Sequence, residues 1–118
     1  MAKLIESYEF GEIIVDGKRY TNDLIIFPEI IIDSWWRKEG HNVHIKDLEE
    51  IIGHLPKPEI LVLGTGYHGL VRVPNEIEDF LESHGIELAA QSTKEACRTF
   101  NILLESNKQV AGAFHLTC

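Results

Sequence analysis

The chain has 118 residues, of which 44% are hydrophobic, so it is long enough for one hydrophobic core and too short for two ordinary ones. Its 11 basic and 19 acidic side chains give a net charge of −8, which repels nucleic-acid phosphates and anionic lipid surfaces. We therefore expect a single domain over residues 1–118 that binds neither nucleic acid nor membrane.

The cellular compartment is predicted from segments that the sequence lacks. No apolar stretch approaches the roughly 20 residues of a membrane-spanning helix, because residues 24–32 are interrupted by Pro28 and Glu29. Residues 1–6 contain neither a long apolar segment nor a small-residue cleavage site, so we expect no secretory signal and a cytoplasmic protein. Two cysteines make no disulfide framework, and both are predicted to be free thiols.

The N-terminal part of the chain consists of short segments rich in β-branched and aromatic residues, which is typical of strands. Residues 7–15 contain two such segments around Gly11 and predict a hairpin. Asp16 and Gly17 form a turn dipeptide, and residues 23–26 predict a further strand.

The stretch that organises the rest of the chain begins at Glu59 and contains the apolar run at residues 60–63, which is followed by Gly64, Thr65 and Gly66. A run without polar alternation predicts a strand buried on both faces, as in a parallel sheet covered by helices. Ligands of such sheets usually bind where the strands end, so a site is possible at residues 64–69.

Helices and strands are predicted to alternate around this run. Helices are predicted for residues 47–53, 74–85 and 93–105, and strands for residues 86–90 and 109–114. Ser92 and Glu95 fit a capping box, in which each side chain accepts the backbone N–H of the other residue. Two consecutive βαβ units give parallel strands, and with the N-terminal hairpin they predict an α/β fold with a mixed sheet.

Residues 64–69 match the GxGxxG pattern of dinucleotide-binding sites, and Glu87 lies about 20 residues further on. That mechanism requires a helix to begin at the third glycine, so that its amides meet the pyrophosphate. Residues 70–73 are instead extended in character, and Pro74 places the helix start later. We therefore favour a structural glycine turn over a dinucleotide site.

A second ligand hypothesis uses the edge of the sheet where the predicted strands end. Parallel neighbours bring the glycine loop and the starts of both later helices to this edge, where free helix amides favour an anion. In the competing interpretation, which we favour, the amides are bonded internally and the arginines pair with surplus acids. The candidate ligand-binding residues are Gly64, Thr65, Gly66, Arg72, Thr93, Arg98 and Asn101.

The six histidines invite a metal hypothesis. His41, His44 and Asp47 have the spacing of ligands on one face of a helix, but Gly40 and Asn42 argue against a helix there. The sequence also lacks the CxxC and HExxH patterns. We therefore predict solvated or capping histidines, with no metal and no cofactor.

Cys97 is placed early in a predicted helix beside Arg98, and both features lower the pKa of a thiol. A catalytic thiol also needs a base, which His68 or His115 supplies only if the fold brings one of them close. We favour the alternative, in which Cys97 is a small buried side chain.

Trp35 and Trp36 precede a basic pair and offer two interpretations. Tryptophan and arginine dominate the centres of protein interfaces, so the segment could anchor a partner or a second copy of the chain. Alternatively, one indole lies in the core and the other stacks under a basic side chain. The candidate partner-surface residues are Trp35, Trp36, Arg37 and His41.

Four segments together resemble a family of small stand-alone domains of uncharacterised function. The segments are DGKRY at 16–20, WRKEGH at 36–41, ILVLGTG at 60–66 and ACRTFNILL at 96–104. The family includes archaeal and bacterial hypothetical proteins, the vertebrate adipogenesis-associated domain protein and a mitochondrial assembly factor of respiratory NADH dehydrogenase. The resemblance implies a three-layer α/β domain with a mixed sheet, and it implies no reaction.

The resemblance also bears on two sites. Residues 64–66 resemble the signature turn of the family, whereas Gly69 is an addition of this chain, which weakens the dinucleotide interpretation. Alanine often replaces Cys97 in the family, which weakens a thiol mechanism. Our leading hypothesis is a non-enzymatic accessory domain that acts through protein contact or self-association around residues 35–41. The alternative is a binder or enzyme for a small anionic ligand at residues 64–69.

Overall fold

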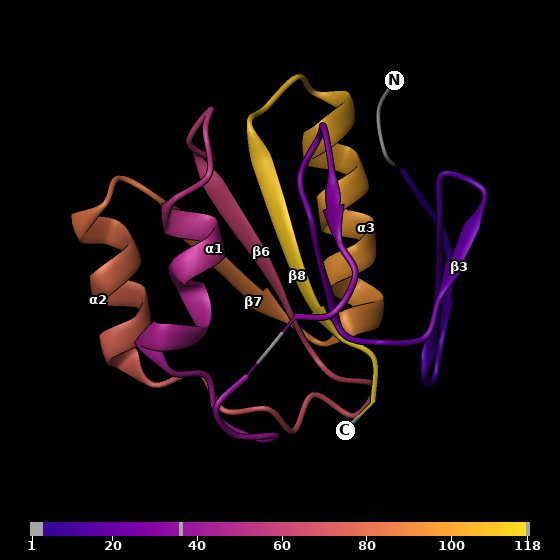
Figure 1. Ribbon diagram of the computed structural model, residues 1–118, viewed down its shortest axis with the longest axis horizontal. Coiled ribbons are helices and arrows are strands. Elements are labelled where there is room, and N and C mark those ends of the chain that lie inside the picture. The colour runs from indigo at the N-terminus through magenta and orange to yellow at the C-terminus, as the bar shows by residue number, and fades with distance from the viewer. Residues whose placement is uncertain (1–3, 36, 118) are drawn as a thin grey trace.

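The computed structural model describes residues 4–35 and 37–117 and arranges them in three layers (Figure 1). Helices α1 (Glu49–Ile52) and α2 (Asn75–Ser83) lie on one face of a five-stranded sheet. Helix α3 (Thr93–Glu105) lies on the other face, beside a separate three-stranded sheet at the right of the view. The predicted three-layer α/β architecture is therefore confirmed.

The five-stranded sheet has the order β5-β4-β8-β6-β7. Its strands are β4 (Leu24–Ile26), β5 (Ile31–Ile32), β6 (Ile60–Thr65), β7 (Glu87–Gln91) and β8 (Val110–His115). Strand β6 lies between β8 and β7 and is parallel to both, and Leu61 pairs with Leu88 on one side and Ala111 on the other. This confirms the predicted βαβαβ unit, whose crossover helices α2 and α3 cover opposite faces of the sheet (Figure 1).

The N-terminal hairpin forms a sheet of its own. Its strands are β1 (Ile5–Glu9), β2 (Glu12–Val15) and β3 (Lys18–Tyr20), which pair antiparallel in that order. The hairpin is as predicted, but the antiparallel strands of the mixed sheet are β4 and β5 instead. The reason is that the outer edge of β1 meets α3, where the Asn101 carboxamide bonds both the N–H and the C=O of Ile5 at 2.8 Å.

Two hydrophobic clusters fill the spaces on either side of the five-stranded sheet. Along β6, Leu61 and Leu63 belong to the cluster under α1 and α2, whereas Val62 belongs to the cluster under α3. Successive side chains of a strand point to opposite faces, so an apolar run is what a strand covered on both faces requires. All three side chains are fully buried, as the sequence predicts.

The helix bounds follow the sequence signals closely, with one correction at a cap. A 3-10 turn, η1 (Ile45–Leu48), leads into α1, α2 begins directly after Pro74, and α3 spans Thr93–Glu105 as predicted. The predicted capping box is wrong, because the Ser92 side chain makes no cap hydrogen bond. The Glu95 carboxylate accepts a bond from Arg98 at 3.0 Å instead, since a charged donor one turn along gives the stronger interaction.

Among residues 4–35 and 37–117, no helix combines the length and the apolar composition that crossing a membrane requires.

Candidate functional site

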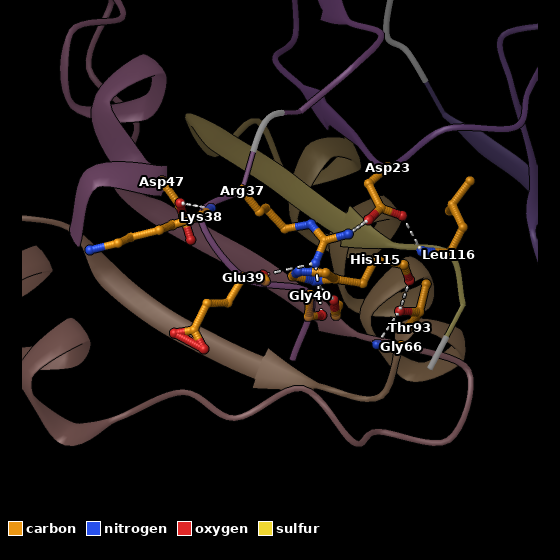
Figure 2. A network of polar contacts seen from close by, with 11 residues as sticks. Asp23, Arg37, Lys38, Glu39, Gly40, Asp47, Gly66, Thr93, His115 and Leu116 are labelled. Atoms are coloured by element: carbon orange, nitrogen blue, oxygen red, sulfur yellow. Dashed lines mark hydrogen bonds and ion pairs between the residues drawn. The ribbon is translucent and has the colours of Figure 1, made fainter. Parts of the chain in front are cut away.

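The glycine turn after β6 packs directly against the start of α3. A side-chain Cβ at Gly64 would lie 2.7 Å from Thr93 Oγ1 and 2.9 Å from a ring carbon of Phe114, so only glycine fits there. The Gly66 N–H donates to Thr93 Oγ1 at 2.8 Å, and Thr93 Oγ1 donates in turn to the His115 C=O at 2.6 Å (Figure 2). The Thr93 hydroxyl thus joins β6, β8 and α3 at the carboxyl ends of the strands.

The loop that follows does not have the geometry of a dinucleotide site. Gly66 and Gly69 both have positive φ, at 105° and 68°, and the Gly69 N–H donates to the Gly66 C=O at 3.1 Å. Helix α2 begins only at Asn75, so the helix that follows this loop does not start at the third glycine, as a dinucleotide site requires. This arrangement is the structural turn that the sequence favours.

A polar network lies beside this turn (Figure 2). The Asp23 carboxylate pairs with Arg37 and accepts the Leu116 N–H at 2.8 Å, and the Arg37 guanidinium also donates to the Gly40 C=O at 2.8 Å. Asp23 therefore connects the strand β4 region to the chain after β8 and to the segment after Trp35. The sequence gives no signal for this role, because Asp23 and Leu116 are far apart along the chain.

Asp47 organises the second half of the same segment. Its side-chain oxygens accept the N–H groups of Lys38 and His44, both at 2.9 Å, and its backbone C=O accepts the Trp35 indole N–H at 2.9 Å. Asp47 is buried, and the two hydrogen bonds to its side-chain oxygens compensate part of the cost of burying its carboxylate. The spacing from His44 to Asp47 therefore reflects a loop cap.

His115 is buried at the centre of the network and is neutral at physiological pH. Its Nδ1 lies 2.9 Å from the Gly64 C=O and donates to it, and its ring lies 4.8 Å from the Trp35 ring. Burial lowers the pKa of His115 to about 4, and the charge of Arg37 acts in the same direction. The bond to Gly64 and the charges of Asp23 and Asp47 oppose that shift but do not overcome it.

Cys97 is the buried thiol that the sequence favours. It is 7% exposed on the inner face of α3, and burial raises its thiol pKa to about 12. The nearby Tyr8 hydroxyl donates to the Leu116 C=O at 2.8 Å, and its pKa is also raised to about 12, chiefly by burial. Neither group is ionised near neutral pH, so neither is prepared to act as a nucleophile.

The seven ligand candidates fall into three separate places. Gly64, Thr65, Gly66 and Thr93 lie together at the turn, where their polar groups bond to one another, to Gln91 and to His115. Arg72 is exposed, and its backbone forms an isolated parallel β-bridge with Asn42. Arg98 and Asn101 line a hollow of about 290 Å³ between α3 and β1, together with Lys94 and Cys97.

The predicted partner surface is only partly at the surface. Trp35 is 6% exposed, and it is held in the core by its bond to Asp47 and by its contact with His115, so its ring is not offered to a partner. Arg37 is turned inward to Asp23. His41 is exposed, and Trp36 lies outside the described residues.

A different group of side chains is exposed together. Phe10, at the β1–β2 turn, is 58% exposed, and Tyr67, in the glycine loop, is 48% exposed. Their ring centroids lie 5.6 Å apart, edge to face, and the His68 ring lies 5.0 Å from that of Tyr67 and 6.5 Å from that of Phe10. We call Phe10, Tyr67 and His68 the aromatic patch. Leu70, further along the same loop, is 62% exposed.

Two of the histidines, His44 and His54, pair with carboxylates. His44 pairs with Glu39 at 2.7 Å, and His54 stacks on Phe27 and pairs with Glu29 at 2.9 Å. Within residues 4–35 and 37–117, no three metal-binding side chains converge on one point.

The fold and this site define a small three-layer α/β domain whose polar clusters bond internally and on whose surface two exposed aromatic rings, Phe10 and Tyr67, contact each other. The chain belongs to the family described as protein of unknown function DUF498/DUF598, whose model matches residues 5–115. This confirms the family that the sequence motifs indicate.

Several curated relatives carry the name NADH dehydrogenase [ubiquinone] 1 alpha subcomplex assembly factor 3. The chain is 28% identical to that protein of Homo sapiens over 113 residues, which cover 95% of this chain and 59% of the relative. It is 31% identical to the Danio rerio protein over 111 residues, which cover 93% of this chain and 62% of the relative. The chain therefore spans about three fifths of the length of the curated relatives that it matches.

Solved structures share the whole fold. An outer membrane protein from Bartonella henselae superimposes with a TM-score of 0.83 at 25% identity, over 99% of this chain and 97% of that one. A conserved hypothetical protein from Pyrococcus horikoshii gives a TM-score of 0.76 at 26% identity, over 97% and 98% of the two chains. The architecture is thus shared by bacterial and archaeal proteins.

Proposed function

We propose that this chain is an accessory domain that binds another protein through the aromatic patch and that it has no catalytic activity of its own. The observation that carries the proposal is the exposure of Phe10 and Tyr67, whose rings contact each other on the surface. Burying such rings against a partner provides most of the binding energy in many interfaces.

The patch is held in place by the backbone, which lowers the entropic cost of binding. The Gly11 N–H donates to the Leu116 C=O at 2.9 Å, and the Tyr67 N–H donates to the Thr117 C=O at 3.1 Å. The chain after β8 therefore fastens the β1–β2 turn to the glycine loop. A surface that is ordered before binding loses less conformational freedom when a partner docks.

The partner that we propose is a different protein and not a second copy. Each copy carries a net charge of −8, so two copies repel at long range. The names of the curated relatives describe assembly factors of NADH dehydrogenase, which supports a role in protein contact. Subunits of NADH dehydrogenase are accordingly the first partners to test. The predicted cytoplasmic location stays a prediction, which cell fractionation would test.

A photo-crosslinking amino acid placed at position 10 or 67 tests this proposal, with position 102 as the matched control. Ile102 on α3 is 63% exposed and therefore as accessible as the patch, but it is outside it. We expect positions 10 and 67 to label the same protein, identified by mass spectrometry as an NADH dehydrogenase subunit, and position 102 not to label it. Labelling of a second copy alone, or equal labelling from all three positions, would contradict the proposal.

The alternative function is the binding of a small anionic ligand, and the hollow between α3 and β1 favours it. Lys94 and Arg98 bring two positive charges to this hollow of about 290 Å³. Arg98 is already paired with Glu95 at 3.0 Å, which reduces the attraction for an anion. A thermal-shift screen with phosphosugars and nucleotides would support the alternative if a ligand raised Tm and Arg98→Gln abolished that shift.

A further inference from the structure

Strand β7 ends the five-stranded sheet and leaves one side of its backbone unpaired. In the part of the chain that the structure describes, β7 pairs with β6 alone, and the order of the sheet places β7 at its edge. The edge of a sheet presents N–H and C=O groups that another extended chain can pair with. Native proteins usually cover or modify such edge strands, so an accessible edge is a candidate binding site.

Leu88 and Ala90 are the two residues of β7 that direct their backbone groups to this open side, as the bonds of their neighbours show. The Glu87 N–H donates to the Glu59 C=O at 2.9 Å, and the Gln91 C=O accepts the Thr65 hydroxyl at 3.0 Å. Glu87 and Gln91 therefore face β6. Because alternate residues of a strand bond to opposite sides, Leu88 and Ala90 direct their N–H and C=O groups away from β6.

A groove runs along the same strand between β7 and α2. One hollow of about 780 Å³ and a second of about 310 Å³ share Glu78 and Leu88 in their linings. Leu88 is half-buried and Ala90 is exposed, so this part of the strand is accessible from solvent. A segment paired to the five residues of β7 would extend about 17 Å, at about 3.3 Å per residue.

The negative charge of the groove favours a positively charged segment as its ligand. The larger hollow is lined by the carboxylates of Glu59, Glu78, Glu82 and Glu87, against the single ammonium of Lys108. Glu78 and Glu82 are four residues apart on α2 and therefore lie on one face of the helix. If the β7 strands of two copies paired edge to edge, the carboxylates of one groove would approach those of the other, and the like charges would oppose the pairing.

We propose that β7 binds an extended, lysine- or arginine-containing segment of a partner protein as an additional strand of the sheet. Main-chain hydrogen bonds to Leu88 and Ala90 hold the segment, and its basic side chains pair with Glu78 and Glu82. The β7 proposal depends on the proposed function in one respect, namely that the partner is a protein. The β7 edge and the aromatic patch are different surfaces, so either proposal can fail without the other.

The test uses two synthetic six-residue peptides, one alternating lysine with valine and the other alternating glutamate with valine. They are titrated into the ¹⁵N-labelled chain and followed by NMR. We expect the lysine peptide to shift and protect the amides of Leu88 and Ala90 and to bind at least about tenfold more tightly than the glutamate peptide. Equal binding of both peptides, or shifts confined to other elements, would overturn the proposal.

Charge variants complete the experiment without altering the strand. The double variant Glu78→Gln/Glu82→Gln should weaken binding of the lysine peptide about three- to tenfold, since each side chain is exposed and its ion pair is worth little singly. The control Glu9→Gln/Glu105→Gln makes the same charge change on β1 and α3 and should leave binding unchanged. Equal weakening by both pairs, or shifts of Leu88 and Ala90 that grow with protein concentration when no peptide is present, would refute the assignment.

Discussion

Gly66 and Thr93 exchange two hydrogen bonds at the start of α3. The Gly66 N–H donates to Thr93 Oγ1 at 2.8 Å, and the Thr93 N–H donates to the Gly66 C=O at 3.0 Å. The pair fixes the glycine turn to the helix, and the turn carries Tyr67 of the aromatic patch. The polar groups that the sequence suggests for ligand binding therefore position the surface that we propose to bind a protein.

Gly64→Ala should destabilise the fold by about 1–3 kcal/mol, because the added methyl group overlaps Thr93 and Phe114 in a packed interior. Urea unfolding followed by circular dichroism measures the change. Gly40→Ala is the control, since a Cβ there meets no atom within 4 Å, and its stability should match that of the unmodified chain. Equal losses in the two variants would show that close packing at residue 64 is not the cause.

Thr93→Val should cost roughly 2–4 kcal/mol of unfolding free energy, because it leaves the Gly66 N–H and the His115 C=O buried without their partner. Thr93→Ser retains the hydroxyl and loses one methyl group, so its loss should be about 1 kcal/mol. Chemical denaturation of both variants makes the comparison. If serine were as damaging as valine, the hydroxyl would not be what joins these elements.

Stability should fall as the pH is lowered from about 6.5 towards about 4. The folded His115 has its pKa lowered to about 4, whereas an unfolded histidine titrates near 6.5, so the unfolded chain binds the additional proton in this range. The contribution is complete above this range and amounts to roughly 3 kcal/mol.

His115→Asn isolates that effect, because an asparagine amide can still donate to the Gly64 C=O but does not titrate. The pH dependence of its urea midpoint should be flatter than that of the unmodified chain between pH 6.5 and 4. NMR should in addition show no protonation of the native His115 ring at pH 6. A ring that titrates with an ordinary pKa would contradict its burial.

Cys97 should resist thiol reagents in the native protein, because its side chain is buried and its raised pKa leaves almost no thiolate at mildly alkaline pH. The measurement uses Cys118→Ser, so that Cys97 is the remaining thiol. Colorimetric labelling should be absent in buffer and complete in denaturant. Rapid labelling of the native variant would place the thiol at the surface instead.

Local patterns were sufficient to predict most of the elements. The apolar run around Val62 predicts a strand covered on both faces, and proline and glycine signals predict the bounds of α2 and α3 to within a residue or two. The capping box failed because Glu95 has a competing partner in Arg98. That competition depends on side-chain geometry, which a four-residue pattern does not contain.

The sites were less predictable because they are built from contacts between distant parts of the chain. Asp23 meets Leu116, and Phe10 meets Tyr67, although nothing near any of these residues marks the pairing. The sequence leaves Trp35 open as a partner anchor or as a core residue, and in the fold Asp47 accepts its indole N–H in the core. Residue type alone does not decide whether an aromatic ring is buried or exposed.

The most direct test of the central claim is the affinity for the partner that crosslinking at position 67 identifies. Isothermal titration compares the unmodified chain with Phe10→Ser/Tyr67→Ser and with the control Ile102→Ser. We predict that the double variant loses at least about tenfold in affinity while Ile102→Ser binds normally, since hot-spot rings carry most of the binding energy. Unchanged affinity of the double variant would contradict the claim that this protein acts through its aromatic patch.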